Sequence, residues 1–349
     1  MKINSIATYA LNNSQRLNNA NLQRALNNAQ KEVVTGRHAD IGKTYGFFTS
    51  SVVTTENQIK HINQIEITNS FTENRLSTMQ LAMTSMVESS NNFIGQLTAG
   101  LGGSLDKSLL QTMGQSALEE LTSSANVTIN GEFVFSGVNS DKSALVDYRS
   151  ASGAPAITAV QDAFSTTFGF PVSDIAAQSI SPAALESFID GPFMDLFNDT
   201  NWQTLWTGAS DRGMRSKIST RELVEIPVTA DADAFRKLTA AAVLINEFAD
   251  GQLKLSTLDQ LTSSALQLLV ENVPELGVEQ AKIGTIEARV ENANERMEYQ
   301  KSILQQQLSR LTDVDSFEAA TRLNQIVVNL EASYSVTAKI QSLSILNYV

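Results

Sequence analysis

Apolar residues recur at alternating steps of three and four along both ends of this 349-residue chain. Such a series keeps one face of a helix turned toward a partner helix, so it predicts long helices that pair as coiled coils. The longest series contains three methionines and three polar residues, and its members are Ile62, Ile65, Asn69, Thr72, Leu76, Met79, Met83, Met86, Ser90, Phe93 and Leu97. The polar members weaken such a seam but fix its register.

The C-terminal end carries a comparable series in two blocks. The first block is Ile283, Ile286, Val290, Ala293, Met297, Leu304, Leu308 and Leu311, and the second is Leu323, Val327, Leu330, Tyr334, Thr337, Ile340, Leu343 and Leu346. Asp313 and Asp315 lie between the blocks, where short acidic side chains commonly cap or interrupt a helix. We therefore expect two consecutive helices with a break at these aspartates.

The N-terminal series is weaker than the other two. It comprises Ile3, Ile6, Ala10 and Leu17 and then, after a change of register, Leu22, Leu26, Ala29 and Val33. Eight asparagines within residues 1–30 make this helix marginal in isolation. Either the amides form a solvated face, or the segment folds only when neighbouring subunits bury its apolar stripe.

Proline and glycine separate the two ends from the middle of the chain. All six prolines and both tryptophans lie within residues 155–274, while residues 285–349 contain neither proline nor glycine. Because proline breaks helix interiors, its absence from the ends permits long helices. The predicted fold is mainly α: an elongated antiparallel coiled-coil rod of N- and C-terminal helices with an inserted small α+β domain. The expected boundaries are 1–137 for the first half of the rod, 138–275 for the insertion and 276–349 for the second half.

Short elements are predicted in and beside the insertion. Residues 130–137 read as a short strand, Met214–Ser219 and Glu222–Val228 as a β-hairpin, and Ala234–Phe248 as an amphipathic helix. The aromatic residues predict the core of a small domain more readily than a ligand site; they are Phe164, Phe188, Phe193, Phe197, Trp202 and Trp206.

Charge and composition exclude several classes of function. The net charge is −12, and residues 138–275 hold 18 acidic and 9 basic side chains, which argues against a nucleic-acid binder. The chain has no cysteine and two histidines, so thiol catalysis and zinc or iron–sulfur sites of the cysteine type are excluded. The apolar runs are too short for a membrane span, and the N-terminus lacks the apolar core of a cleaved signal peptide.

The remaining candidates for chemistry are weak. Ala99–Ser104 is rich in glycine, but no Gly-Lys-Ser/Thr follows it, so we interpret it as a turn between helices. Asp313 and Asp315 are better explained as capping residues than as paired catalytic carboxylates. We therefore expect no catalytic, cofactor-binding or metal-binding residues, and no enzyme.

Motifs at both ends of the chain resemble those of the bacterial flagellin superfamily. The C-terminal motif is Asp313-Val314-Asp315-Ser316-Phe317-Glu318-Ala319-Ala320-Thr321-Arg322-Leu323 with Leu330-Glu331-Ala332-Ser333-Tyr334, and the N-terminal motif is Glu32-Val33-Val34-Thr35-Gly36-Arg37. Asn130-Gly131-Glu132-Phe133-Val134-Phe135-Ser136-Gly137 and the ending Leu346-Asn347-Tyr348-Val349 are similar to those of the hook–filament junction proteins within the superfamily.

The resemblance implies a structural subunit of the extracellular bacterial flagellum, exported without a cleaved signal peptide through the flagellar type III channel. It would join the hook to the filament as a ring of copies docked by their terminal helices. Its partners would be other copies of itself, a neighbouring hook-associated protein, flagellin, and a cytoplasmic export chaperone bound to the C-terminal helix. We expect no nucleic acid and no membrane insertion. The alternatives are a flagellin that forms the filament, a secreted adhesin-like binding protein and, last, a hydrolase.

The residues predicted to form the assembly and chaperone-binding face are the apolar positions of the terminal helices. They are Ile3, Ile6, Leu22, Leu26, Leu308, Leu311, Leu323, Val327, Leu330, Tyr334, Ile340, Leu343 and Leu346.

Overall fold

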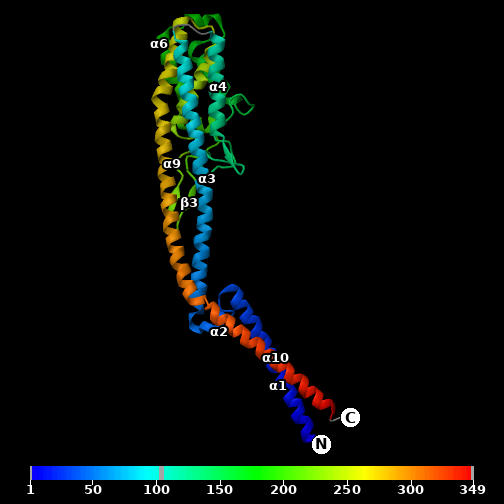
Figure 1. Ribbon diagram of the computed structural model, residues 1–349. Coiled ribbons are helices and arrows are strands. Elements are labelled where there is room, and N and C mark those ends of the chain that lie inside the picture. Colours follow the sequence, from blue (N-terminus) through cyan, green and yellow to red (C-terminus); the bar gives the residue numbers. More distant parts are fainter. Residues whose placement is uncertain (1, 102–105, 347–349) are drawn as a thin grey trace. The chain divides into compact units, whose positions relative to one another are not determined.

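The computed structural model describes residues 2–101 and 106–346 (Figure 1). For residues 2–8, 11–12, 41, 45 and 341–346 it describes the backbone only. Long helices dominate the described chain, and the few strands are two or three residues long. The mainly α fold class is therefore confirmed.

The elements follow one another in this order. They are α1 (Lys2–Thr35), α2 (Ile41–Tyr45), η1 (Gly46–Phe48), α3 (Thr49–Gly100), α4 (Lys107–Ala125), β1 (Thr128–Ile129), β2 (Glu132–Phe133), α5 (Ala154–Phe168), η2 (Ile175–Ser179), α6 (Pro182–Phe188), η3 (Ile189–Phe193), η4 (Met194–Phe197), α7 (Asp199–Asn201), η5 (Trp202–Trp206), β3 (Arg215–Lys217), β4 (Leu223–Glu225), α8 (Asp233–Phe248), α9 (Leu255–Thr312) and α10 (Ser316–Leu346).

The chain folds into two compact units. Unit 1 comprises Met1–Gln64 and Met297–Val349, and unit 2 comprises Ile65–Arg296. The residues of the expected insertion, 138–275, belong to unit 2 together with parts of the helices on either side of them. The three-part division at 137/138 and 275/276 remains a prediction.

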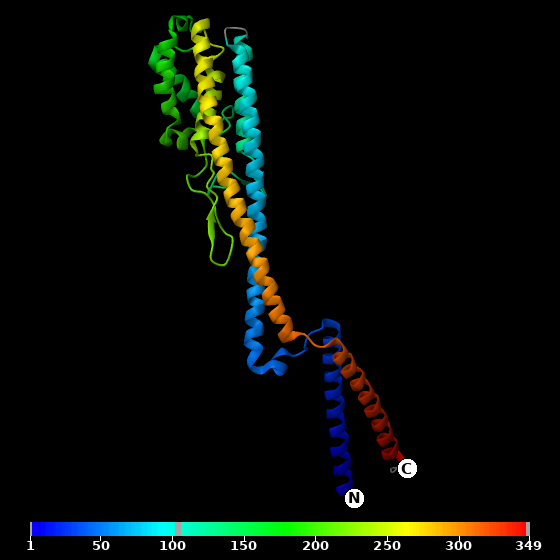
Figure 2. The same ribbon diagram turned by 60° about the vertical axis from the view of Figure 1, so that its left-hand side comes forward.

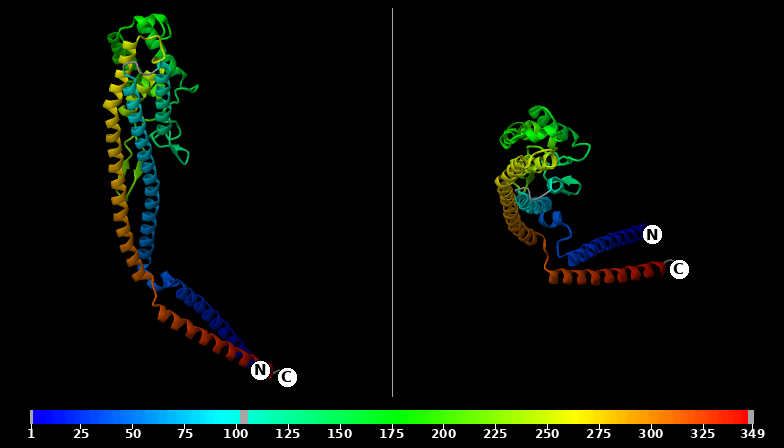
Figure 3. Two further views of the ribbon diagram at one scale, coloured as in Figure 1. Left: turned by 45° about the horizontal axis from the view of Figure 1, so that its top comes forward. Right: turned by 90° about the horizontal axis from the view of Figure 1, so that it is seen from above.

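In unit 1, α1 and α10 pack side by side, with the two ends of the chain at the same end of the pair (Figures 2 and 3). Their contacts run from Asn19–Ser333 near that end to Glu32–Arg322 near the other, so the helices are antiparallel. The helix break at Asp313–Asp315 is confirmed. The carboxylate of Asp315 accepts the backbone N–H groups of Phe317 and Glu318, as an N-cap does.

In unit 2, α3 and α9 form a second antiparallel pair. Asn69 bonds to Asn294 and Gln80 bonds to the carbonyl of Gln280, so residue numbers fall on one helix as they rise on the other. Every predicted seam member from Ile65 to Leu97 is buried, including the polar Asn69, Thr72 and Ser90. The seam read from the sequence is therefore confirmed in this unit.

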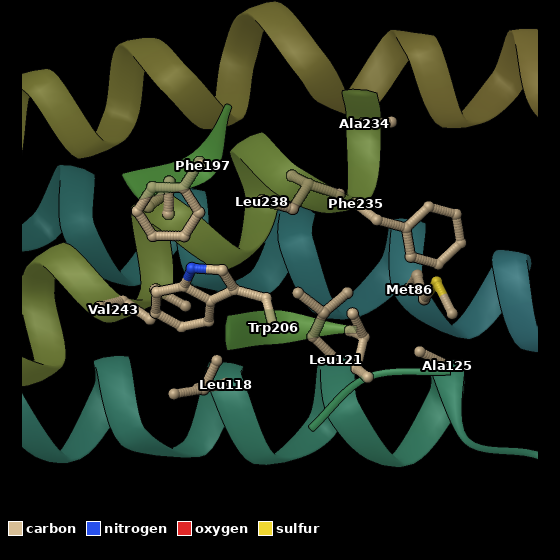
Figure 4. Packing of buried hydrophobic residues seen from close by; sticks show 14 of the residues in the cluster. Met86, Leu118, Leu121, Ala125, Phe197, Trp206, Ala234, Phe235, Leu238 and Val243 are labelled. Carbon is tan, nitrogen blue, oxygen red and sulfur yellow. The ribbon is translucent and has the colours of Figure 1, made fainter. Parts of the chain in front are cut away.

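The core of unit 2 lies between α3, α4, α8 and the aromatic segments of the insertion. Side chains of Phe197, Val243 and Leu118 surround Trp206, and Met86 lies beside Phe235 (Figure 4). Trp202 and Trp206 are both buried, and their indole N–H groups donate to the carbonyls of Ala230 and Leu196. Both tryptophans thus belong to the core, as the aromatic pattern predicts.

Helix α8 corrects one prediction. The sequence suggested an amphipathic helix over Ala234–Phe248, with one polar face toward solvent. The helix is instead surrounded, because twelve of its sixteen residues are buried, including Arg236 and Thr239. Ala240 and Ala241 let neighbouring elements approach the side of the helix opposite the predicted apolar face, because small side chains permit close packing.

Helix α9 reaches into the residues predicted to form the insertion and contains a proline, Pro274. The helix begins at Leu255 and continues through this proline. Proline removes one hydrogen bond, to the carbonyl four residues earlier. That carbonyl belongs to the exposed Val270, where water can bind it, so one break in the ladder does not end the helix.

Two antiparallel hairpins complete the fold. The predicted hairpin around Thr220-Arg221 is confirmed, with Ser216 paired to Val224 in β3 and β4. The strand predicted over residues 130–137 shortens to β2, which pairs with β1 around Asn130 and Gly131. After Phe133 the chain turns inward, and Phe135 is fully buried.

The turn predicted at Ala99–Ser104 lies partly outside the described residues. Helix α3 ends at Gly100, and α4 begins at Lys107. The side chain of Asp106 caps α4, and hydrogen bonds from the hydroxyl and the backbone N–H of Ser108 lower the pKa of this carboxyl.

Candidate assembly surfaces

The seam between α1 and α10 is polar near the chain ends and apolar at its other end. Ala29 and Ala319 are buried in the apolar part, and Leu22, Leu323 and Leu330 are half-buried. Such a short apolar contact offers little area, and each fully buried leucine contributes about 1.5–3 kcal/mol. The pair therefore depends on further contacts along its length.

Amides and hydroxyls supply those contacts nearer the chain ends. Asn19 accepts a hydrogen bond of 2.5 Å from Ser333, and Gln23 donates one of 2.9 Å to the hydroxyl of Tyr334. The side-chain oxygen of Gln15 is buried without a hydrogen-bond partner among the described residues. An unpaired buried oxygen is unfavourable by about 1–3 kcal/mol. This part of the pair is consequently only weakly held together.

A clasp joins the end of α1 to the link between α9 and α10. The N–H of Val314 donates to Gly36 and the N–H of His38 donates to Thr312, both at 2.9 Å. The buried carboxylate of Glu32 lies behind the clasp and bonds Arg322 at 3.3 Å and the N–H of Ala39 at 3.1 Å. The clasp sets where α10 begins relative to α1.

Large apolar side chains of this helix pair remain exposed. On α1 they are Tyr9, Leu17, Val33 and Val34, and on α10 they are Phe317, Val327, Val328, Tyr334 and Val336. Several of these exposed side chains are larger than the side chains that the pair buries between its two helices. Exposed apolar patches of this kind commonly mark interaction surfaces.

A shallow groove of about 480 Å³ lies elsewhere in unit 1. Its lining residues come from η1, α3 and α9, and they are Phe48, Ser51, Ile303, Gln306, Gln307, Arg310 and Leu311. Phe47 stands beside it, with its ring centroid 5.7 Å from that of Phe48 in an edge-to-face arrangement. This groove combines apolar walls with amide side chains and a single charge.

The structure places the predicted assembly residues in three groups. Leu308 is buried, and Leu22, Leu26, Leu311, Leu323, Leu330 and Ile340 are half-buried. Val327 and Tyr334 are more exposed, at the edge of the seam, where Ile326 and Ser333 are half-buried instead. Ile3, Ile6, Leu343 and Leu346 lie in helices, but their side chains are outside the described residues.

The sequence reading missed the exposed phenylalanines and valines. Phe47, Phe317 and Val328 belong to no heptad series, and each one is exposed in unit 1. The signal was available in adjacent apolar pairs such as Val327-Val328, because two neighbouring helix positions cannot both face the same seam.

In unit 2, Arg75 braces the segment 130–137. Its guanidinium donates to the carbonyls of Phe133 at 2.7 Å and Val134 at 3.1 Å, and lies 3.4 Å from the carboxylate of Glu132. Burial lowers the pKa of Arg75, and the charge of Glu132 opposes that shift. Arg75 thereby ties the β1–β2 turn to α3.

The β3–β4 hairpin is fastened across α3 and α9. Asn69 donates to the carbonyl of Ile218 at 2.9 Å, and Thr72 bonds Ser216 at 2.7 Å. At the tip, the carboxylate of Glu222 lies 3.0 Å from both Arg289 and Arg296. These contacts explain why Asn69 and Thr72 occupy the α3 seam.

The insertion contains further buried polar groups that serve packing. Burial disfavours the charge of Arg236, but hydrogen bonds and charges from Asp199 and Asp231 outweigh it and raise the pKa. Burial, together with the charge of Glu247, raises the pKa of Tyr148, whose ring stacks on Trp206 at 5.6 Å. Both groups lie in the packed interior.

The described part of the chain offers no cluster of three or more His, Asp or Glu side chains that could hold a metal ion. Within the same residues, no helix combines the length and apolarity that crossing a membrane requires.

Comparison with known families agrees with the helix pairs. The bacterial flagellin N-terminal helical region matches residues 6–140, and the bacterial flagellin C-terminal helical region matches residues 266–349. A search of curated proteins gives no match. The two matched regions cover more than half of the chain and contain almost all of α1, the whole of α3, α4 and α10, and most of α9. The chain therefore belongs to the bacterial flagellin superfamily, whose members are non-enzymatic structural subunits that assemble with other subunits into the extracellular flagellum.

Proposed function

We propose that this subunit joins the flagellar hook to the filament, the role of hook-associated protein 3. The observation that carries the proposal is the segment 130–137, which is similar to the motif of that protein. Within the segment, Asn130 and Gly131 adopt positive φ angles of 53° and 84° at the tip of the β1–β2 turn. Gly137 also has a positive φ, of 61°, and lies against the backbone of Arg212.

The exposed apolar faces of α1 and α10 support a role in assembly. A ring of copies would cover these faces with neighbouring terminal helices. Each fully buried valine, leucine or phenylalanine side chain favours association by about 1.5–3 kcal/mol, before the ordering of the subunits is subtracted. The partners on either side of the ring would be a hook-associated protein and flagellin.

A cytoplasmic chaperone would hold the C-terminal helix before export through the type III channel. Val327 and Tyr334 are exposed on α10, whereas Leu323, Leu330 and Ile340 lie half-buried toward α1. A chaperone that covers all five must therefore replace α1 on this helix. Chaperone binding and the α1–α10 pair would exclude each other.

A deletion strain tests the junction role. Loss of this subunit should leave hooks without filaments and release flagellin into the medium, and the full-length chain should restore filaments. Electron microscopy of the cells and immunoblotting of the medium provide the readouts. Normal filaments in the deletion strain would refute the junction role.

Flagellin is the second candidate, because the family match includes filament subunits. A flagellin can polymerise by itself into long filaments. Growth of such filaments from the purified chain alone would favour this alternative over a junction subunit.

A further inference from the structure

Among the described side chains of α10, Phe317 is the most exposed large apolar one, at 83%. It lies in the first turn of the helix, two residues after the capping residue Asp315 and directly before Glu318. Residues 313–322 hold three acidic side chains and one basic side chain, Arg322. Phe317 is therefore an apolar projection within an acidic surface.

The groove of unit 1 has the opposite character. Phe48, Ile303 and Leu311 form apolar walls, and Arg310 is the one charged residue that lines it. Among the ion pairs of the described residues none involves Arg310, so its charge is available to a partner. The groove is consequently an apolar receptor with a basic edge.

We propose that this groove, lined by Phe48, Ile303 and Leu311, binds Phe317 of a second copy of the chain. The apolar ring would enter between the apolar walls, and Arg310 would face the acidic residues beside Phe317. Charge complementarity of this kind fixes orientation and favours the correct partner. The inference rests on the proposed function, because it supplies the contact that would hold the ring together.

A contact between two different surfaces of one chain has a geometric consequence. Each copy would offer one phenylalanine and one groove, so a pair of copies still has a free phenylalanine at one end and a free groove at the other. Such head-to-tail contacts produce closed rings when the rotation between copies closes. The chain does not fill the groove itself, because Phe317 is not among the lining residues and remains exposed.

Cross-linking tests the contact directly, because the chain contains no cysteine. Cells lacking the native subunit would co-express one chain with Gln307→Cys in the groove and another with Ser316→Cys beside Phe317. Isolated flagella would be treated with a short thiol-specific cross-linker. We expect a dimer whose linked peptides carry both cysteines, identified by mass spectrometry.

A matched pair controls for chance proximity. Gln307→Cys combined with Ser335→Cys uses another exposed serine of α10 and should give no such dimer. No dimer from Gln307→Cys with Ser316→Cys, or a cross-link from Gln307→Cys to a different flagellar subunit, would overturn the proposal.

Alanine substitutions test the energetics. Phe317→Ala should weaken each contact by about tenfold to a hundredfold, given the apolar area of a phenylalanine. Filaments should then detach more readily under shear. Phe71→Ala is the matched control, because Phe71 is 60% exposed but belongs to unit 2 and does not line the groove. Loss of filaments with Phe71→Ala and not with Phe317→Ala would show that Phe317 does not make the contact and would refute the proposal.

The two proposals fail in different ways. If the deletion strain lacks filaments and the cysteine strains grow them without a cross-link, the junction role stands and this contact falls. If the deletion strain grows normal filaments, the junction role falls whatever the cross-linking shows.

Discussion

Two glycines near the β1–β2 turn share a backbone conformation but not an environment. Gly131 and Gly137 both have φ in the left-handed region. A Cβ at Gly131 would meet nothing within 4 Å, whereas a Cβ at Gly137 would lie 2.3 Å from the carbonyl oxygen of Arg212. Substitutions at Gly131 and Gly137 can thus separate the cost of the left-handed conformation from the cost of a steric clash.

Alanine at these two positions should have unequal effects on stability. Gly131→Ala should lower the free energy of unfolding by about 1–2 kcal/mol, the cost of a left-handed alanine. Gly137→Ala should lower it by about 1–3 kcal/mol more, because the backbone at Arg212 must also move. Urea unfolding followed by circular dichroism measures both. Equal losses would show that the close approach at Gly137 is not constraining.

Arg75 offers a second test among single residues. Arg75→Ala should lower the free energy of unfolding by about 2–4 kcal/mol, because two backbone carbonyls lose their donor in a buried place. Glu132→Gln is the matched control and should change it by less than about 1 kcal/mol, since this carboxylate is largely exposed. Comparable losses in urea unfolding would mean that the ion pair, and not the carbonyl contacts, matters.

Among elements, the α1–α10 pair should be stabilised by removing a polar group from its seam. Gln15→Leu should raise the stability of α1 by about 1–2 kcal/mol, because it replaces a buried oxygen that has no partner. Hydrogen exchange of the α1 amides reports this change. Gln23→Leu, which removes the bond to Tyr334, should give no increase. Slower exchange in both variants would point to a general gain from hydrophobicity.

Periodicity predicted the long helices well, because an apolar seam keeps one face of each helix turned toward a partner helix. The buried series from Ile65 to Leu97 and the break at Asp313–Asp315 follow from the sequence alone. The burial of α8 and the passage of α9 through Pro274 do not. Both features depend on which elements pack around a helix, and the local sequence pattern does not predict those elements.

For the whole molecule, removal of residues 320–349 should separate assembly from the folding of unit 2. This truncation takes away most of α10 and leaves unit 2 intact, since unit 2 ends at Arg296. We expect the shortened chain to be absent from assembled flagella, α1 to exchange its amides faster, and α8 to keep its protection. A normal filament from the shortened chain would contradict docking by the terminal helices.

The assembly surfaces were less predictable than the fold. Half-buried positions such as Leu323 and Leu330 follow from the heptad pattern, because that pattern describes the contact within one chain. Phe317 and the groove beside Phe48 do not follow from it. Residues proposed to contact a second copy follow no heptad spacing. They can be recognised only by their exposure in the folded chain.

The burial of both tryptophans in one core has a practical consequence. Unit 1 contains no tryptophan, and Trp202 and Trp206 both lie in unit 2. Indole emission therefore reports the melting of a single unit. A subunit whose terminal helices have come apart would still fluoresce like the native protein, so a dye or a label placed on α1 or α10 is needed to follow unit 1.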